Sequence, residues 1–165
     1  MKKVLMLLIF LTGILSAEPD KKFLKFVLDS VHGRNFVGCD NAISEVFAHI
    51  GGQEIRVDTP VNPDAKDSIR ITSSYGSKGD NIFLDVLVRK ANKVCTVSQT
   101  AMYTDNKSCT AKLEEVPSFK FKAETNDMIW SKNDGGVNML LLPLNGSCVT
   151  IFTLMSSYSV DKNKR

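Results

Sequence analysis

The sequence predicts an α+β domain in which two short helices pack on one face of an antiparallel sheet of about six strands. Apolar residues recur at helical spacing up to residue 50, and the period changes to two from residue 53 onward. Near the C-terminus, Asn145-Gly146 separates two apolar runs, 137–144 and 147–155. Both turn residues tolerate the positive φ of a type I′ turn, so we expect a hairpin in the middle of the sheet. A small closed β-barrel is the alternative architecture.

The N-terminal segment has the three-part pattern of a secretory signal peptide. Lys2 and Lys3 precede an apolar run over residues 4–15, and Ser16 and Ala17 are small. The run is too short to cross a ~30 Å hydrocarbon core as a helix. We therefore expect cleavage after residue 17, no membrane insertion afterwards, and one exported domain over residues 18–165, in the periplasm or secreted.

Two helices are expected before the sheet. The first runs from a cap at Asp20 to about His32 and stops at Gly33. The second runs from residue 42 to about residue 50, capped by Asp40 or Asn41. The residues expected to be buried on the two helices are Phe23, Phe26, Val27 and Val31, and then Ile43, Val46, Phe47 and Ile50.

Alternating apolar and polar residues predict the strands that follow. Two prolines, at 60 and 63, exclude a central strand there because proline lacks the amide hydrogen. Residues 112–117 fit either a turn of helix or an extended lead-in. The expected strands are 54–58, 68–75, 81–90, 94–104 and 118–130, followed by the two arms of the hairpin.

The hairpin is apolar on both faces. In its first arm Met139 and Leu141 alternate with Leu140 and Leu142. Helices on one side of a sheet would leave one of these sets uncovered. The sequence therefore predicts that the sheet curls over itself, that the proline-rich loop covers the leucines, or that another chain does.

Four cysteines in an exported chain predict two disulfides. If neighbouring strands form a meander, Cys109 and Cys148 lie at one end of the sheet and Cys95 lies at the other. Our first choice is therefore Cys39–Cys95 with Cys109–Cys148, and a local Cys95–Cys109 bridge is the main rival. The cysteines lack C-x-x-C spacing, which argues against a zinc site and against thiol–disulfide catalysis.

Composition and motifs argue against several functions. Without residues 1–17 the chain has 19 basic and 18 acidic residues, because Lys2 and Lys3 are lost from the total of 21. That balance does not favour nucleic acid as a partner. Neither histidine, His32 or His49, lies in a recognisable catalytic motif. We expect no metal, no cofactor and no enzymatic activity.

These observations favour an exported binding protein that neutralises another protein. An immunity protein to a wall-targeting toxin and an inhibitor of a lysozyme-like enzyme both fit. A small envelope hydrolase, dependent on His49, and a structural or self-associating envelope component, including a homodimer, are the alternatives. Because loops between elements commonly carry binding sites, the candidate binding residues are Asp64, Tyr75, Lys78, Asp80, Tyr103, Trp130 and Asp134.

Overall fold

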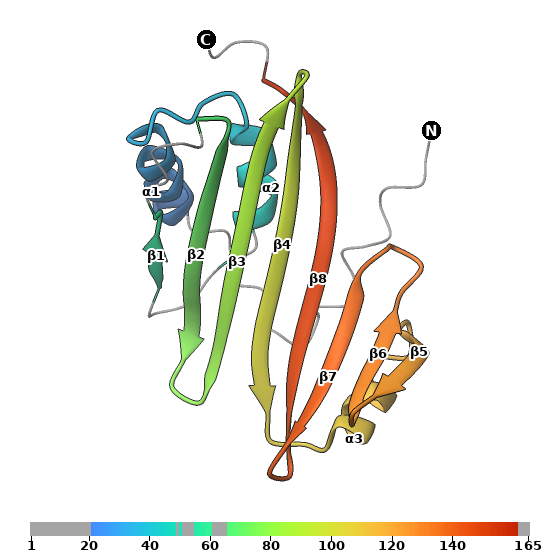
Figure 1. Cartoon of the computed structure of the whole chain (residues 1–165). Helices are drawn as coiled ribbons and strands as arrows, with labels where there is room; N and C mark the ends of the chain where they lie inside the picture. The colour runs from blue at the N-terminus through green and yellow to red at the C-terminus, as the bar shows by residue number, and fades with distance from the viewer. Residues whose placement is uncertain (1–20, 49, 51–54, 61–65, 162–165) are drawn as a thin grey trace.

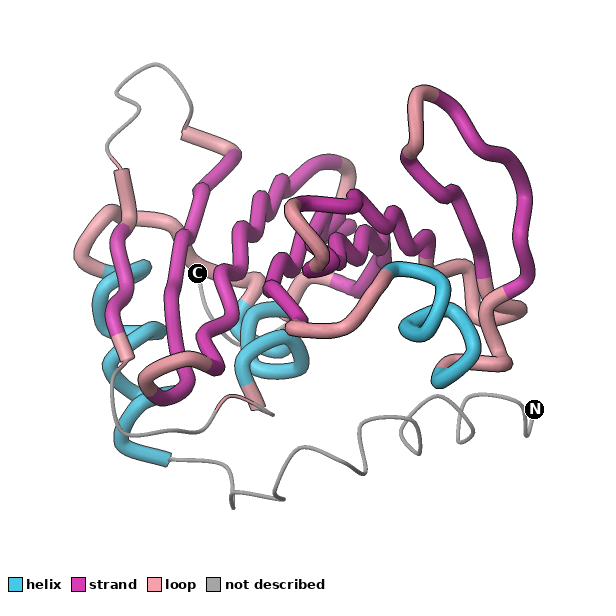
Figure 2. The backbone as a smooth tube through the Cα atoms, turned by 90° about the horizontal axis from the view of Figure 1, so that it is seen from below, coloured by secondary structure: helices cyan, strands magenta, loops and turns pink. Residues whose placement is uncertain are grey.

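A computed structural model describes residues 21–161 apart from 49, 51–54 and 61–65. These residues form three helices and an open, eight-stranded antiparallel sheet (Figure 1). Figure 2 shows the helices on one side of that sheet. The predicted signal peptide, with Asp20, lies outside the described residues, as do His49 and Asp64.

The first two helices are those that the helical spacing predicts. Helix α1 spans Lys21–His32 and buries Phe23, Val27 and Val31, whereas Phe26 is 55% exposed, contrary to expectation. Phe26 points away because its position is one residue before Val27, and a helix turns by about 100° per residue.

Helix α2 spans Asp40–Phe47, two residues earlier than expected at its start. Its first residue is Asp40, and neither Asp40 nor Asn41 caps it with a side chain. The carboxylate of Asp161, from the far end of the chain, accepts hydrogen bonds from the backbone amides of Asp40 at 2.8 Å and Asn41 at 3.3 Å. A carboxylate is favourable there because the first amides of a helix lack partners within the helix. The C-terminal segment therefore holds α2 in place.

The sheet has eight strands rather than about six, and its order is β1-β2-β3-β4-β8-β7-β6-β5. Because β1 and β5 form its two edges, the sheet is open and the barrel alternative is wrong. The last hairpin enters beside β4, so β8 lies in the middle of the sheet, as predicted. The strands are β1 Arg56–Asp58, β2 Ser68–Ser77, β3 Asp80–Ala91, β4 Val94–Asp105, β5 Lys120–Thr125, β6 Met128–Lys132, β7 Asn138–Leu144 and β8 Ser147–Ser159.

The region expected to form one strand, 118–130, is instead a hairpin. Asn126 and Asp127 both have positive φ, 49° and 66°, and reverse the chain between β5 and β6. Asparagine and aspartate adopt this conformation more readily than other residues with a Cβ atom, so the pair can form a type I′ turn without glycine.

Residues 112–117, which fit either a turn of helix or an extended lead-in, lie partly in a helix. Helix α3 spans Cys109–Glu115, and the side chain of Ser108 accepts a hydrogen bond from the amide of Ala111 at 3.2 Å. Serine is among the preferred N-cap residues. Pro117 follows shortly after the last helical turn, where it disfavours continuation of the helix.

One face of the sheet is covered by all three helices. Helices α1 and α2 pack over β2, β3 and β4, where Ile71, Val86 and Val97 are fully buried. Helix α3 covers a second, smaller cluster around Met139 and Leu141 of β7. We call this side the covered face.

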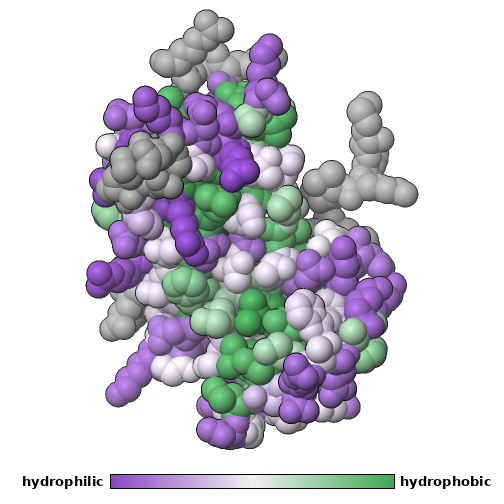
Figure 3. All heavy atoms as spheres, viewed as in Figure 1, coloured by the Kyte–Doolittle hydropathy of each residue, from purple (hydrophilic) through white to green (hydrophobic). Residues whose placement is uncertain are grey.

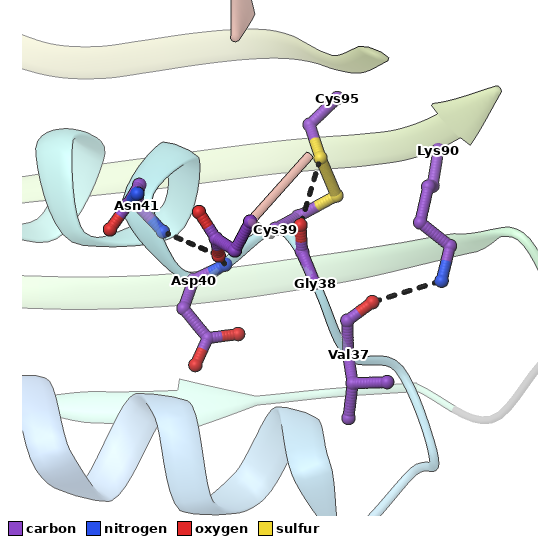
Figure 4. The surroundings of a disulfide bond; sticks show 8 residues. Val37, Gly38, Cys39, Asp40, Asn41, Lys90 and Cys95 are labelled. Carbon is purple, nitrogen blue, oxygen red and sulfur yellow. Dashed lines mark hydrogen bonds between the residues drawn. A yellow bond between two sulfur atoms is a disulfide. The ribbon is translucent and has the colours of Figure 1, made fainter. Parts of the chain in front are cut away.

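Each cluster contains one disulfide. Cys39–Cys95 joins the start of α2 to β4, and Cys109–Cys148 joins α3 to β8. This is the first-choice pairing from the sequence, although the strand order is not the simple meander from which it was inferred. In Figure 4, the loop before α2 is also held to β3, because the ammonium of Lys90 donates to the carbonyl of Val37 at 2.9 Å.

Candidate protein-binding face

No helix of the described residues covers the other side of the sheet, which we call the uncovered face. On this side an apolar row crosses five adjacent strands. The backbone register pairs Phe83 with Met102, Met102 with Ile151, Ile151 with Leu140, and Leu140 with Trp130. Directly paired residues of antiparallel strands project to the same side. We call these five residues the apolar row.

The apolar row is continuous, and three of its five residues are exposed to solvent. Phe83 is 41% exposed, Met102 40% and Trp130 44%, while Ile151 and Leu140 are half-buried between them. Figure 3 looks onto this face and shows hydrophobic atoms over the lower middle of the sheet, beside a hydrophilic region. The further exposed apolar residues on this face are Leu87, Val94, Leu144 and Met155.

A polar row lies next to the apolar row, two residues away from it on each strand. It consists of Asp85, Thr100, Thr153, Asn138 and Lys132, paired in that order across the same five strands. The guanidinium of Arg70 binds the carboxylate of Asp85 through two hydrogen bonds of 2.7 and 2.8 Å. That pair raises the pKa of Arg70 above its usual value, first through the hydrogen bond and then through the charge of Asp85.

The candidate binding residues predicted from loops do not lie together in the structure. Lys78 and Asp80 lie at the turn between β2 and β3, and Asp134 lies in the β6–β7 loop, where it pairs with Lys120 at 3.0 Å. Tyr75 and Tyr103 are on the covered face, as their register with Ile82 shows. Of the described candidates, only Trp130 belongs to the apolar row.

Tyr103 contacts helix α3 through the side chain of Lys112. The ammonium of Lys112, on α3, lies 5.4 Å from its ring centroid and 3.1 Å from the carboxylate of Asp105. Burial by itself lowers the pKa of Lys112, but Tyr103 and Asp105 raise it by more. The carboxylate of Glu115 forms ion pairs with both Lys107 and Lys112. The hydrogen bond from Lys107 is the largest cause of the lowered pKa of Glu115. These contacts hold α3 against the end of β4.

His32 is the one histidine in the part of the chain that the structure describes. The ring nitrogen Nε2 of His32 lies 3.0 Å from the carboxylate of Asp40, at the start of α2. Among these residues, no group of three or more histidine, cysteine or acidic side chains could hold a metal ion. In the same part of the chain, no helix is long and apolar enough to span a membrane.

Loop-based reasoning missed four of the five residues in the apolar row. A signal was present, because Phe83 and Leu87 alternate with the core residues of their strand, and the hairpin is apolar on both faces. Their alignment into one row depends on pairing between strands distant in the sequence. No family model, curated protein or solved structure matches the chain.

Proposed function

We propose that this chain is an exported, non-enzymatic binding protein that uses its uncovered face to neutralise or inhibit another protein. The apolar row is the observation that carries the proposal. Burying hydrophobic surface drives most protein association, and contiguous exposed apolar patches on soluble proteins commonly mark interaction sites. Two disulfides, one at each core cluster, support export to an oxidising compartment.

The size of the patch fits a specific complex. At about 200 Å² per large side chain, the exposed fractions of the seven exposed apolar residues on this face leave roughly 650 Å² of apolar surface. A standard interface buries ~800 Å² on each partner, a little over half of it non-polar. The apolar row, together with Leu144 and with Leu87 and Met155 beyond the polar row, therefore supplies the non-polar share of one such interface. Trp130 is its best candidate anchor, since tryptophan is enriched among residues that dominate binding energy.

The proposed partners are a toxin that attacks the cell wall or a lysozyme-like hydrolase. A capture experiment from periplasmic extract tests this, with the mature protein immobilised and the bound proteins identified. We expect one dominant partner for the wild type, and loss of that partner for Met102→Asp. Phe26→Asp is the matched control, because Phe26 is equally apolar and 55% exposed but lies on α1.

The captured protein then provides the functional readout. Its activity, for example hydrolysis of peptidoglycan, should fall on addition of wild type or Phe26→Asp and stay unchanged with Met102→Asp. Equal inhibition by Met102→Asp would exclude the uncovered face. Turnover of peptidoglycan by the purified chain alone would favour the hydrolase alternative instead.

A further inference from the structure

The two rows on the uncovered face are symmetric about β8. From β3 to β6, the apolar row reads aromatic, aliphatic, Ile151, aliphatic, aromatic, and its ends are Phe83 and Trp130. The polar row has an acid at one end, Asp85, a base at the other, Lys132, and Thr153 at its centre. Such a pattern matches a copy of itself turned by 180° about a line along β8.

We propose that a second copy of this chain binds the uncovered face, with a twofold axis that runs parallel to β8 between the two sheets. An axis in that direction keeps each row at its own level along the strands and exchanges β3 with β6 and β4 with β7. Apolar residues then meet apolar residues. An axis across the strands would instead leave every strand facing its own copy, so Asp85 of β3 could not face Lys132 of β6.

The apolar contacts of this dimer follow from the exchange of strands. Phe83 faces Trp130 of the second copy, Met102 faces its Leu140, and Ile151 meets its own counterpart at the axis. Each aromatic–aliphatic–aromatic row is thereby matched along its full length. Sheets that pack face to face lie ~10 Å apart with their strands within about 30° of one another, and large side chains of this kind can fill that space.

Charge complementarity selects the same arrangement. Asp85 faces Lys132 of the second copy, and the symmetry makes this contact twice. Lys132 is exposed and forms no ion pair within the described part of the chain, so its charge is available. The carboxylate of Asp85 already holds Arg70, but two carboxylate oxygens have about four acceptor sites in all. The contact would therefore extend an existing pair into a three-residue network.

The area also suits a reversible dimer. The ~650 Å² of apolar surface on each copy corresponds to a standard interface, which buries ~1,600 Å² in total, less than the 2,000–5,000 Å² that obligate dimers bury. We therefore expect a dimer that dissociates on dilution. Because the same face would bind the proposed target, self-association and target binding exclude each other, although the dimer itself does not depend on that function.

Sedimentation velocity of the purified mature protein, with its disulfides intact, tests the proposal without any partner. We expect the wild type to pass from monomer to dimer as its concentration rises through the micromolar range. Ile151→Asp should remain monomeric, since it brings two carboxylates together at the axis. Phe26→Asp should dimerise like the wild type, and near-ultraviolet circular dichroism should show that both variants are folded.

A surface substitution tests the charge contact. Lys132→Glu should weaken the dimer at least tenfold, because two attractions become repulsions, while Lys132→Arg should keep it. These changes leave the buried core intact, because Lys132 is exposed.

Cross-linking tests the axis. In Thr153→Cys the two thiols face each other, so a short bis-maleimide that spans the ~10 Å between packed sheets should join the copies. In Thr72→Cys, on β2, they lie roughly 29 Å apart at ~4.8 Å per strand and should not be joined. A wild type that stays monomeric at all concentrations overturns the proposal, as does cross-linking at residue 72 but not at residue 153. Either result leaves the capture experiment to decide the proposed function separately.

Discussion

Removal of Cys109–Cys148 should destabilise the protein mainly through its unfolded state. The change is the double substitution Cys109→Ala with Cys148→Ala, which leaves no free thiol from this pair. The bridge closes a loop with a sequence separation of 39 residues. In the chain-entropy model, a loop of that length raises the free energy of unfolding by about 3.9 kcal/mol at 25 °C.

The second bridge gives an internal comparison. Cys39–Cys95 has a separation of 56 residues, for which the same relation gives about 4.2 kcal/mol. Loop entropy alone therefore predicts nearly equal losses for the two double variants. Packing adds a smaller cost in both cases, because all four cysteines are buried and alanine leaves space where each sulfur was.

Urea denaturation followed by circular dichroism measures these effects. We expect each double variant to lose about 4 kcal/mol of the 5–15 kcal/mol typical of a domain. The slope of the free energy against urea should also rise, because an unfolded chain without the cross-link exposes more surface. A loss below about 1 kcal/mol, or an unchanged slope, would show that the bridge acts through native contacts and not by restricting the unfolded chain.

Three further substitutions test local features by denaturation or titration. Gly76→Ala should lower the free energy of unfolding by at least about 2 kcal/mol, because φ is 132° and a Cβ there would lie 2.0 Å from the carbonyl oxygen of Asp80. Gly79→Ala should lower it by about 1 kcal/mol, because φ is 87° but the space around a Cβ is open. Asp161→Ala should cost about 1 kcal/mol through the lost cap of α2, and an unchanged midpoint would contradict that role. Burial raises the pKa of Tyr75, so absorbance at high pH should show one tyrosine ionising late, and Tyr75→Phe should remove that step. The raised pKa also means that Tyr75 destabilises the fold only above pH ~10, where the unfolded chain ionises first.

Local patterns were sufficient to predict much of the fold. The spacing of Val27 and Val31 identified α1, and the alternation in β3 separated Val86 and Val88 from the residues of the opposite face. These features depend on neighbours within a few residues, where helix and strand periods are distinct. The disulfide pairing was also predicted correctly, although the meander behind it was not, because β4 and β5 run in the same direction and the last hairpin inserts beside β4.

Features that depend on distant segments could not be predicted in this way. The N-terminus of α2 is capped by Asp161, about 120 residues away in the sequence. The β5–β6 turn uses Asn126-Asp127, a pair that also occurs in ordinary loops and interrupts no obvious pattern. The candidate binding residues were sought in loops, whereas the exposed apolar surface lies on the strands themselves.

The apolar row shows how local turns create a nonlocal surface. Its five residues come from five strands, and a shift of one residue in any strand would move that strand's member to the covered face. Two-residue turns at Asn92-Lys93 and Asn145-Gly146, all four residues with positive φ, fix β3 against β4 and β7 against β8. The long pairing of β4 with β8 then joins the two hairpins in register. The turns therefore specify more than chain reversal, because they set which side chains meet across the sheet and so determine the surface on which both the partner and the second copy are proposed to bind.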